Sequence, residues 1–361
     1  MRVVIAPDGF GGTLTAREAA AAIAAGWRRV RPDDHLLERP MSDGGEGLLD
    51  TVGTVSDTWH HREVAGPHGH PRQAGFIVRA DGSALIEAAS ACGLHLLPPQ
   101  QRTPARATTY GVGQLLLAAV ELGADPIRVG LGGTAAMDGG TGALNALGWR
   151  LCVADGSGLK IGGDDLHRLA SIDRSWAPSL DTEVELLADV TTPLTEAAER
   201  FGPQKGADAG EIAQLTTALS DLARIAERDL GADPSLATTA GSGAAGGLGY
   251  GLAAALGARL VPGARAVARL VGLEPALVGA DLVVTGEGRL DATSAQGKVV
   301  AVVRDLATAA GCRVVAVVGQ QQGRLHGLDA VVAAAPGGPG DDPAAELAAA
   351  AGHLAVNVDG G

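Results

Sequence analysis

The chain has 361 residues, of which 46% are hydrophobic and 2% aromatic, and its net charge is −13 at pH 7. This length predicts two domains. An acidic chain with few aromatic residues lacks the basic surface and the stacking platforms of nucleic-acid-binding proteins, so no nucleic acid is expected as a partner.

Cellular location follows from what the sequence lacks. No apolar run is long enough to span a membrane, and the short apolar start does not form a signal peptide, so no membrane partner is expected. Cys92, Cys152 and Cys312 are isolated in apolar surroundings and are expected to be buried and reduced. These features predict a cytoplasmic protein.

The first elements of the chain alternate between strand and helix. Residues 3–7 are expected to form a strand, residues 15–29 a helix with a capping box between Thr15 and Glu18, and residues 35–39 a second strand. This order indicates an α/β fold, in which ligands bind beyond the carboxyl ends of the strands. Asp8 and Asp43 both lie there.

The pattern changes after residue 55. Residues 56–88 alternate in polarity, and the turn signals at 66–69 and 81–82 predict antiparallel hairpins. Further on, strands are expected at 127–131 and 184–188, the second ending at Asp189. Helices are expected at 111–122, 138–147, 210–229, 243–256 and 262–272.

The α/β pattern returns near the end of the chain, with strands at 281–284, 313–318 and 329–334 and helices at 297–310 and 343–354. The simplest organisation is a discontinuous, doubly wound flavodoxin-like or Rossmann-like α/β domain formed by residues 1–55 and 275–361. Residues 56–274 would form an inserted mixed α/β domain. The active site is expected in the cleft between the two domains.

Seven short blocks combine glycines with polar or charged residues. Glycine lets backbone N–H groups approach a ligand closely, and carboxylates beside such turns commonly hold Mg²⁺ next to a phosphate. The blocks therefore indicate an enzyme that handles a phosphorylated ligand. They are residues 7–12, 42–47, 130–134, 138–140, 202–206, 241–247 and 285–291.

The chain contains only three lysines, Lys160, Lys205 and Lys298, and the last two adjoin glycine within or near these blocks. A lysine ammonium is a compact charge that suits a phosphate oxygen. Lys205 and Lys298 are therefore candidate phosphate ligands, the alternative being ordinary surface lysines at turns. Lys160 is expected at the surface.

Several other motifs are weak. Gly241-x-Gly243-x-x-Gly246 matches the dinucleotide fingerprint, but no convincing strand precedes it, and a phosphate- or carboxylate-binding helix start fits better. Neither a P-loop nor a serine-hydrolase elbow is present. His68 and His70 suit a solvated turn better than a metal site.

Taken together, the blocks resemble the type I glycerate kinases, bacterial enzymes that phosphorylate D-glycerate with ATP. The resemblance runs in order over nearly the whole chain, from Ala6-Pro7-Asp8 and Pro40–Gly47 to Thr285–Asp291. It implies two α/β domains, one inserted in the other. It also implies ATP and Mg²⁺ as cofactors, D-glycerate or a similar hydroxy acid as substrate, and 2-phosphoglycerate as product. The sequence leaves open whether the chain forms a homodimer.

Roles for individual residues follow as hypotheses. Asp189 is the first choice for the base that accepts the hydroxyl proton and Asp8 the second. Lys205 and Lys298 would offset charge on the transferred phosphoryl group. Mg²⁺ would be held by Asp43, Glu287 or Asp291. The remaining substrate or nucleotide contacts are expected from Gly44, Gly45, Glu46, Arg106, Gly132, Gly133, Thr134, Gly243, Gly246 and Arg289.

Some positions depart from the family pattern. The family usually has serine and lysine at the positions of Gly9 and Gly11, threonine and asparagine at those of Ala136 and Met137, and asparagine at that of Thr192. A kinase for a different hydroxy acid and a catalytically silent binding protein therefore stay open as alternatives. Aspartates such as Asp138, ahead of a helix, have a helix-capping interpretation beside the functional one.

Overall fold

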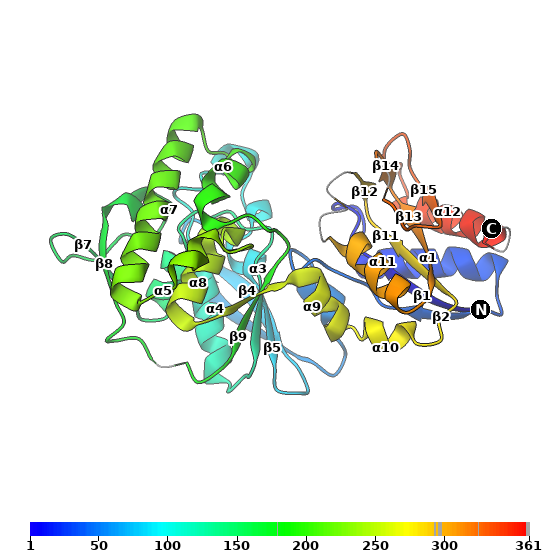
Figure 1. Ribbon diagram of the computed structural model, residues 1–361, viewed down its shortest axis with the longest axis horizontal. Coiled ribbons are helices and arrows are strands. Elements are labelled where there is room, and N and C mark those ends of the chain that lie inside the picture. The colour runs from blue at the N-terminus through cyan, green and yellow to red at the C-terminus, as the bar shows by residue number, and fades with distance from the viewer. Residues whose placement is uncertain (179, 292–293, 295–297, 324, 359–361) are drawn as a thin grey trace. The chain divides into compact units, whose positions relative to one another are not determined.

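The computed structural model describes residues 1–178, 180–291, 294, 298–323 and 325–358 (Figure 1). The chain divides into two compact units. Unit 1 comprises Met1–Asp43, Asp50–Gly53 and Gly263–Gly361, and unit 2 comprises Gly44–Leu49 and Thr54–Pro262.

Unit 1 is built on a five-stranded sheet in which every pair of neighbours is parallel. In spatial order the strands are β15 (Ala330–Ala333), β13 (Arg313–Val318), β11 (Leu282–Gly286), β1 (Arg2–Pro7) and β2 (His35–Glu38). Counted within the unit, this is the order 5-4-3-1-2 of flavodoxin-like folds, whose topological switch point lies between the first and third strands. The switch point of unit 1 therefore lies between β1 and β11.

Helices cover both faces of this sheet. Alternate strand residues such as Ile5, Val284 and Val317 are buried against α1 (Ala16–Val30) and α12 (Pro343–Asn357). Ala316 and Val318 point to the other face and pack with Val300 of α11 (Val299–Ala309). Because successive side chains of a strand alternate between faces, the nearly continuous apolar runs indicate a sheet buried on both sides.

The remaining elements of unit 1 are short. They are α9 (Gly263–Leu270), α10 (Leu273–Leu277) and the parallel pair β12 (Arg289–Leu290) and β14 (Gln320–Gln321). α2 (Leu48–Val52) contains one of the points where the chain passes between the units.

Unit 2 contains a six-stranded mixed sheet. In spatial order its strands are β10 (Arg259–Pro262), β9 (Val184–Ala188), β6 (Ile127–Gly130), β5 (Ala84–Glu87), β4 (Pro71–Val78) and β3 (Thr58–Ala65). β3, β4 and β5 pair antiparallel, whereas β5, β6, β9 and β10 are parallel. The parallel strands therefore end at one common edge of the sheet.

Helices and a small hairpin complete unit 2. The helices are α3 (Ala88–Cys92), α4 (Tyr110–Glu121), α5 (Thr141–Ala146), α6 (Ala197–Phe201), α7 (Ala209–Leu230) and α8 (Leu248–Leu256), and the hairpin pairs β7 (Arg150–Val153) with β8 (Leu169–Asp173). One hydrophobic cluster that includes Phe76, Leu115, Leu186 and Tyr250 joins these elements.

The structure confirms the predicted α/β fold class, with a parallel doubly wound sheet and a second, mixed sheet. The capping box at Thr15 and Glu18 is also confirmed, because both of its hydrogen bonds are present at the start of α1. No helix among the described residues is both long and apolar enough to cross a bilayer.

Several details differ from the sequence prediction, including the unpredicted β7–β8 hairpin and the start of α5 at Thr141 rather than at residue 138. The helix expected at 243–256 begins only at Leu248, because Ala245 and Gly246 adopt left-handed conformations in the preceding 3₁₀ turn, Ala244–Gly247. The helix expected at 262–272 follows a strand, β10, that was missed. Cys152 is half-buried rather than buried, because it lies in the small β7–β8 hairpin.

Candidate active site

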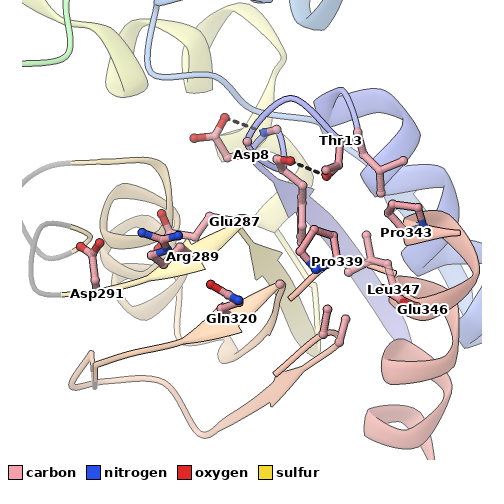
Figure 2. A pocket seen from close by; sticks show the side chains of 18 of the residues that line it. Asp8, Thr13, Glu287, Arg289, Asp291, Gln320, Pro339, Pro343, Glu346 and Leu347 are labelled. Carbon is pink, nitrogen blue, oxygen red and sulfur yellow. Dashed lines mark hydrogen bonds between the residues drawn. The ribbon is translucent and has the colours of Figure 1, made fainter. Parts of the chain in front are cut away.

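A cavity of about 460 Å³ lies in unit 1, at the carboxyl ends of β1, β11, β13 and β15 (Figure 2). Asp8 follows β1 directly and Glu287 follows β11, so the cavity includes the topological switch point. This is where open parallel sheets bind their ligands. The volume falls within the range of pockets that enclose small organic ligands.

Six of the residues predicted from the sequence line this one cavity. They come from blocks far apart in the chain, and parallel pairing of the strands brings them to the same edge. The six are Asp8, Asp43, Glu287, Arg289, Asp291 and Lys298.

Asp8 is held beside other acidic groups. Its Oδ1 accepts a hydrogen bond of 2.7 Å from the backbone N–H of Gly9. Burial raises the pKa of Asp8 well above its ordinary value, and the negative charges of Asp43 and Glu287 raise it further. The carboxylate form is therefore costly until a positive charge neutralises the cluster.

Glu287 carries the clearest sign of a missing ligand. Its side chain is 9% exposed, and its Oε1 is buried without a hydrogen-bond partner among the described residues. Burial is the main cause that raises the pKa of Glu287, and a hydrogen bond with the Ser294 side chain and the charge of Lys298 oppose it. Since buried polar atoms almost always have partners, this oxygen is a candidate contact for a bound cation or donor.

Two cationic side chains lie at the same end of the cavity. Lys298 precedes α11 as its N-cap residue, and its charge lowers the pKa values of both Asp8 and Glu287. Arg289 is exposed on β12. Figure 2 shows Glu287, Arg289 and Asp291 on one side of the cavity. This end can therefore hold anionic groups together with a divalent cation.

The donor set fits Mg²⁺ bound jointly with a ligand. Within residues 1–178 and the other described ranges, no three His, Cys, Asp or Glu side chains are arranged to hold a metal by themselves. Mg²⁺ commonly takes only one or two carboxylates and completes its shell with water and phosphate oxygens. The unpartnered Oε1 of Glu287, close to Asp8 and Asp43, meets that requirement.

A second group of predicted residues gathers in unit 2, where the segment Gly44–Leu49 packs on the loop after β6. A Cβ atom added to Gly130 would lie 2.3 Å from the Gly44 carbonyl oxygen, and one added to Gly132 would lie 2.5 Å from the Gly45 Cα. The two glycine-rich blocks therefore touch backbone to backbone, an approach that side chains at these positions would prevent.

The buried Glu87, which sequence reasoning missed, anchors this contact. It ends β5, is 8% exposed, and accepts a hydrogen bond of 3.4 Å from the backbone N–H of Leu49. Burial raises its pKa, and backbone N–H groups of the 47–49 turn oppose that effect. The signal in the sequence was an acidic residue at the end of the apolar run Ala84–Ile86.

Asp189 lies at the same edge of the unit 2 sheet. It follows β9, which pairs with β6 so that Leu187 stands opposite Gly130. The side chain is partly exposed. Asp189 therefore lies, like the 130–134 loop, at the edge of the sheet where the parallel strands end.

Lys205 is buried behind the 130–134 loop rather than exposed at it. The residue is 4% exposed, and its Nζ donates hydrogen bonds to the Ala136 carbonyl oxygen (2.9 Å) and the Thr134 hydroxyl (3.4 Å). Burial lowers the pKa of Lys205 to about 8, an effect opposed by Cys92 and Asp138. Its ammonium group therefore fixes the end of the loop.

Asp138 has the bonding of a structural residue. Its carboxylate is fully buried and accepts hydrogen bonds from the backbone N–H groups of Thr109 (2.8 Å), Gly140 (3.0 Å) and Gly142 (3.2 Å). These bonds join the starts of α4 and α5. Asp138 is not an N-cap residue, since the N-cap positions are Thr109 and Gly140, but its bonds to backbone N–H groups at both helix starts account for its position.

Three other predicted residues lie apart from both groups of contacts. Arg106 is exposed, with its nearest acidic partner, Asp164, at 4.0 Å. Gly246 packs on the backbone of Ala136, and Gly243 packs on Pro193. Packing within unit 2 thus explains the two glycines.

Two of the departures from the family pattern, Gly11 and Met137, have local explanations. Gly11 lines the unit 1 cavity with a φ of +54°, a left-handed conformation that disfavours lysine. Met137 is fully buried in the hydrophobic cluster of unit 2, where an asparagine amide would need polar partners. Both residues fit the backbone and surroundings that this chain provides.

Comparison with known proteins identifies relatives that match nearly the whole chain. Residues 3–354 match the glycerate kinase family. The chain is 39% identical to glycerate 2-kinase of Escherichia coli K12, over 92% of this chain and 90% of that protein, and 40% identical to glycerate kinase of Bacillus subtilis 168, over 93% and 91%. A crystal structure of a glycerate kinase 2 candidate from Salmonella typhimurium LT2 superimposes with a TM-score of 0.87 at 39% identity, covering 100% of this chain and 98% of that one. The chain therefore belongs to the glycerate kinase family.

Proposed function

We propose that this protein phosphorylates D-glycerate with ATP and forms 2-phosphoglycerate. The observation that carries the proposal is the switch-point cavity of unit 1, where Asp8, Asp43 and Glu287 lie together with Lys298. Family membership and about 40% identity to named glycerate kinases support the choice of substrate.

The reaction forms a bond between a glycerate hydroxyl oxygen and the γ-phosphorus, and breaks the bond from that phosphorus to the bridging oxygen of ADP. The hydroxyl proton passes to a base, which we assign to Asp189 because this residue stands at a strand end and is partly exposed. Lys298 offsets the charge of the phosphoryl group. Lys205 acts indirectly, through its bonds to Thr134 and Ala136.

Asp43, Glu287 or Asp291 would hold Mg²⁺, directly or through water. When bound, the ion neutralises phosphate charge and orients the oxygens for in-line transfer. Asp8 shapes this end of the cavity through its charge coupling to Asp43 and Glu287. The backbone N–H groups of the 132–134 loop in unit 2 are the proposed donors to an anionic group.

A coupled assay of ADP release with ATP, Mg²⁺ and D-glycerate, against a blank without glycerate, tests the proposal. Glycerate-dependent turnover of about 1 s⁻¹ or more, within the usual range of enzymes, is expected. Phosphorus NMR of the product then distinguishes 2-phosphoglycerate from 3-phosphoglycerate. A folded sample without glycerate-dependent turnover contradicts the proposal.

The differences at Gly11 and Met137 favour one alternative, a kinase for another small hydroxy acid. The same assay with a panel of hydroxy acids distinguishes a kinase for D-glycerate from a kinase for another acid, because the preferred acid has the highest kcat/KM. A catalytically silent binding protein would instead give a thermal shift with nucleotide and no turnover with any acid.

A further inference from the structure

The unit 1 cavity has a second end that the proposed chemistry leaves unexplained. Away from Glu287 and Asp291, Thr13 and Glu346 line the wall, but most of it is formed by small and apolar side chains of the C-terminal segment 334–347 and of the loop after β1. They are Phe10, Leu14, Ala334, Ala335, Pro339, Pro343 and Leu347.

The two ends of the cavity are separated in space. Figure 2 shows Glu287 and Asp291 on one side, Pro339, Pro343 and Leu347 on the other, and the Gln320 side chain between them. A ligand that fills the whole cavity must therefore be anionic at one end and flat or apolar at the other, with hydrogen-bonding groups in the middle.

Glycerate does not match this description. It is a small acid whose carbons all carry oxygen, so it would leave the apolar end empty, and apolar surface gains little from a polar ligand. A nucleoside triphosphate matches both ends, because its phosphates are anionic and its base is flat and partly apolar. The cavity of about 460 Å³ lies within the range for nucleotide-sized ligands.

We propose that segment 334–347 forms the base-binding subsite for the purine nucleotide, with the phosphates directed to Glu287 and Lys298. This inference rests on the proposed kinase function and adds the orientation of the nucleotide within the cavity. The Gln320 amide, with one acceptor and two donors, lies where the ribose would pass.

The wall at the apolar end is fixed by backbone and side-chain bonds. The N–H groups of Ala334 and Ala335 donate to the carbonyls of Val318 and Gly319 at 2.7 and 2.9 Å. Glu346 accepts a hydrogen bond of 3.3 Å from the N–H of Gly340, which ties the 336–342 loop to α12. A base could therefore enter a preformed slot, which lowers the entropic cost of binding.

The test compares a nucleotide with an inorganic ligand that lacks the base. Ala335→Leu places a larger side chain at the proposed subsite, and Ala349→Leu makes the same change at an exposed position of α12 that does not line the cavity. Calorimetric titration measures the Kd of Mg·ADP and of Mg·tripolyphosphate for the wild type and both variants.

Ala335→Leu is expected to weaken Mg·ADP binding about tenfold or more, equal to about 1.4 kcal/mol, and to leave Mg·tripolyphosphate within about twofold of wild type. Ala349→Leu should change neither. Unchanged Mg·ADP binding by Ala335→Leu, an equal loss of both ligands, or a wild type that binds no Mg·ADP overturns the subsite.

Hydrogen exchange on the wild type tests the same inference without a substitution. Mg·ADP should slow exchange in peptides covering 334–343, whereas Mg·tripolyphosphate should not; equal protection by both ligands overturns the proposal. Base-dependent binding without glycerate turnover would keep the subsite and reject the kinase function. Glycerate turnover together with Mg·ADP binding that Ala335→Leu does not weaken would keep the kinase function and reject the subsite.

Discussion

Asp8 and Glu287 are the first residues beyond two neighbouring parallel strands, and a backbone hydrogen bond holds them in that relationship. The N–H of Asp8 donates to the carbonyl of Gly286 at 2.8 Å, extending the register that pairs Pro7 with Gly286. Two acidic side chains are thereby fixed at the switch point of the sheet. The negative charges of the two carboxylates repel each other in the folded structure. This repulsion favours binding of a cation between the carboxylates and a phosphate.

Asp8→Asn should make the ligand-free protein more stable at high pH. The pKa of Asp8 is raised in the folded state. The contribution of this residue to the free energy of unfolding is therefore complete below its pKa in the unfolded chain, and it is lost as the pH rises through its pKa in the folded protein. The asparagine Oδ1 can still accept from Gly9. We expect the melting temperature of the variant to exceed that of the wild type by about 2–4 °C above the folded pKa, equal to about 1 kcal/mol.

This stability gain should vanish near pH 4 and should be accompanied by weaker Mg·nucleotide binding, measured by calorimetry. A variant that is less stable than wild type at every pH would contradict the assignment of Asp8 to a repulsive cluster. Mg²⁺ with ADP should raise the melting temperature of the wild type more than that of Asp8→Asn.

Lys298→Ala should lower kcat/KM by about 10²-fold or more, since a removed charge contact to the transferred group typically costs a few kcal/mol. Lys160→Ala is the matched control, because Lys160 is exposed in a loop of unit 2. The control should keep wild-type kinetics. Equal kinetics for the two variants would remove Lys298 from the reaction.

Lys205→Met should change stability with a characteristic pH dependence. The pKa of Lys205 is about 8 in the folded protein and 10.5 for the model group, so between these values the folded state holds fewer protons than the unfolded chain. The wild type should therefore gain stability relative to Lys205→Met as the pH rises from about 8 to about 10.5. Melting curves of both proteins across this range measure the effect; a constant difference would contradict the buried environment.

Asp189→Asn should reduce kcat by at least about 10²-fold while the melting temperature stays unchanged, because a catalytic base contributes about 10²–10⁴-fold. The circular dichroism spectrum serves as the control for folding. A loss of turnover smaller than about tenfold would assign the base to another residue, of which Asp8 is the next candidate.

Gly132→Ala should impair both stability and turnover, because the added Cβ would lie 2.5 Å from the Gly45 Cα and would force two backbone segments apart. Gly158→Ala is the control, since nothing lies within 4 Å of a Cβ at that position. Thermal melting and kcat/KM are compared for both variants. The free energy of unfolding is expected to fall by about 1–3 kcal/mol only for Gly132→Ala. Wild-type stability of Gly132→Ala would show that the two segments separate readily.

Much of the fold could be predicted because local signals agreed with burial. The apolar runs before Asp8 and Glu287 are buried parallel strands, and the capping box at Thr15 marks the true start of α1. The strand β10 was missed because it is only four residues long and lies partly exposed at the sheet edge. Its sequence therefore shows no alternation of polar and apolar residues that would predict a strand. The break before α8 depends on the left-handed Ala245, a conformation that its side chain does not signal.

The candidate site, like the fold, could be predicted only in part from the sequence. The charged residues of the cavity could be predicted because carboxylates and lysines beside glycines indicate phosphate chemistry on their own. The wall formed by Ala335, Pro339 and Leu347 could not, because such residues carry no chemical signal and meet the charged end only through the order of the strands. Likewise, the burial of Lys205 depends on long-range packing that its glycine-rich surroundings do not reveal.

The order of strands in unit 1 also bears on how the protein is made. β1 pairs with β11, which begins 275 positions after β1 ends, at Leu282. During translation β2 emerges soon after β1, whereas the ribosome completes all of unit 2 before β11, the other partner of β1, emerges. Domains generally fold as they are synthesised, so we expect unit 2 to form first, while the edge of β1 that pairs with β11 stays unpaired. The nascent chain should accordingly be most exposed to chaperones until β11 is released.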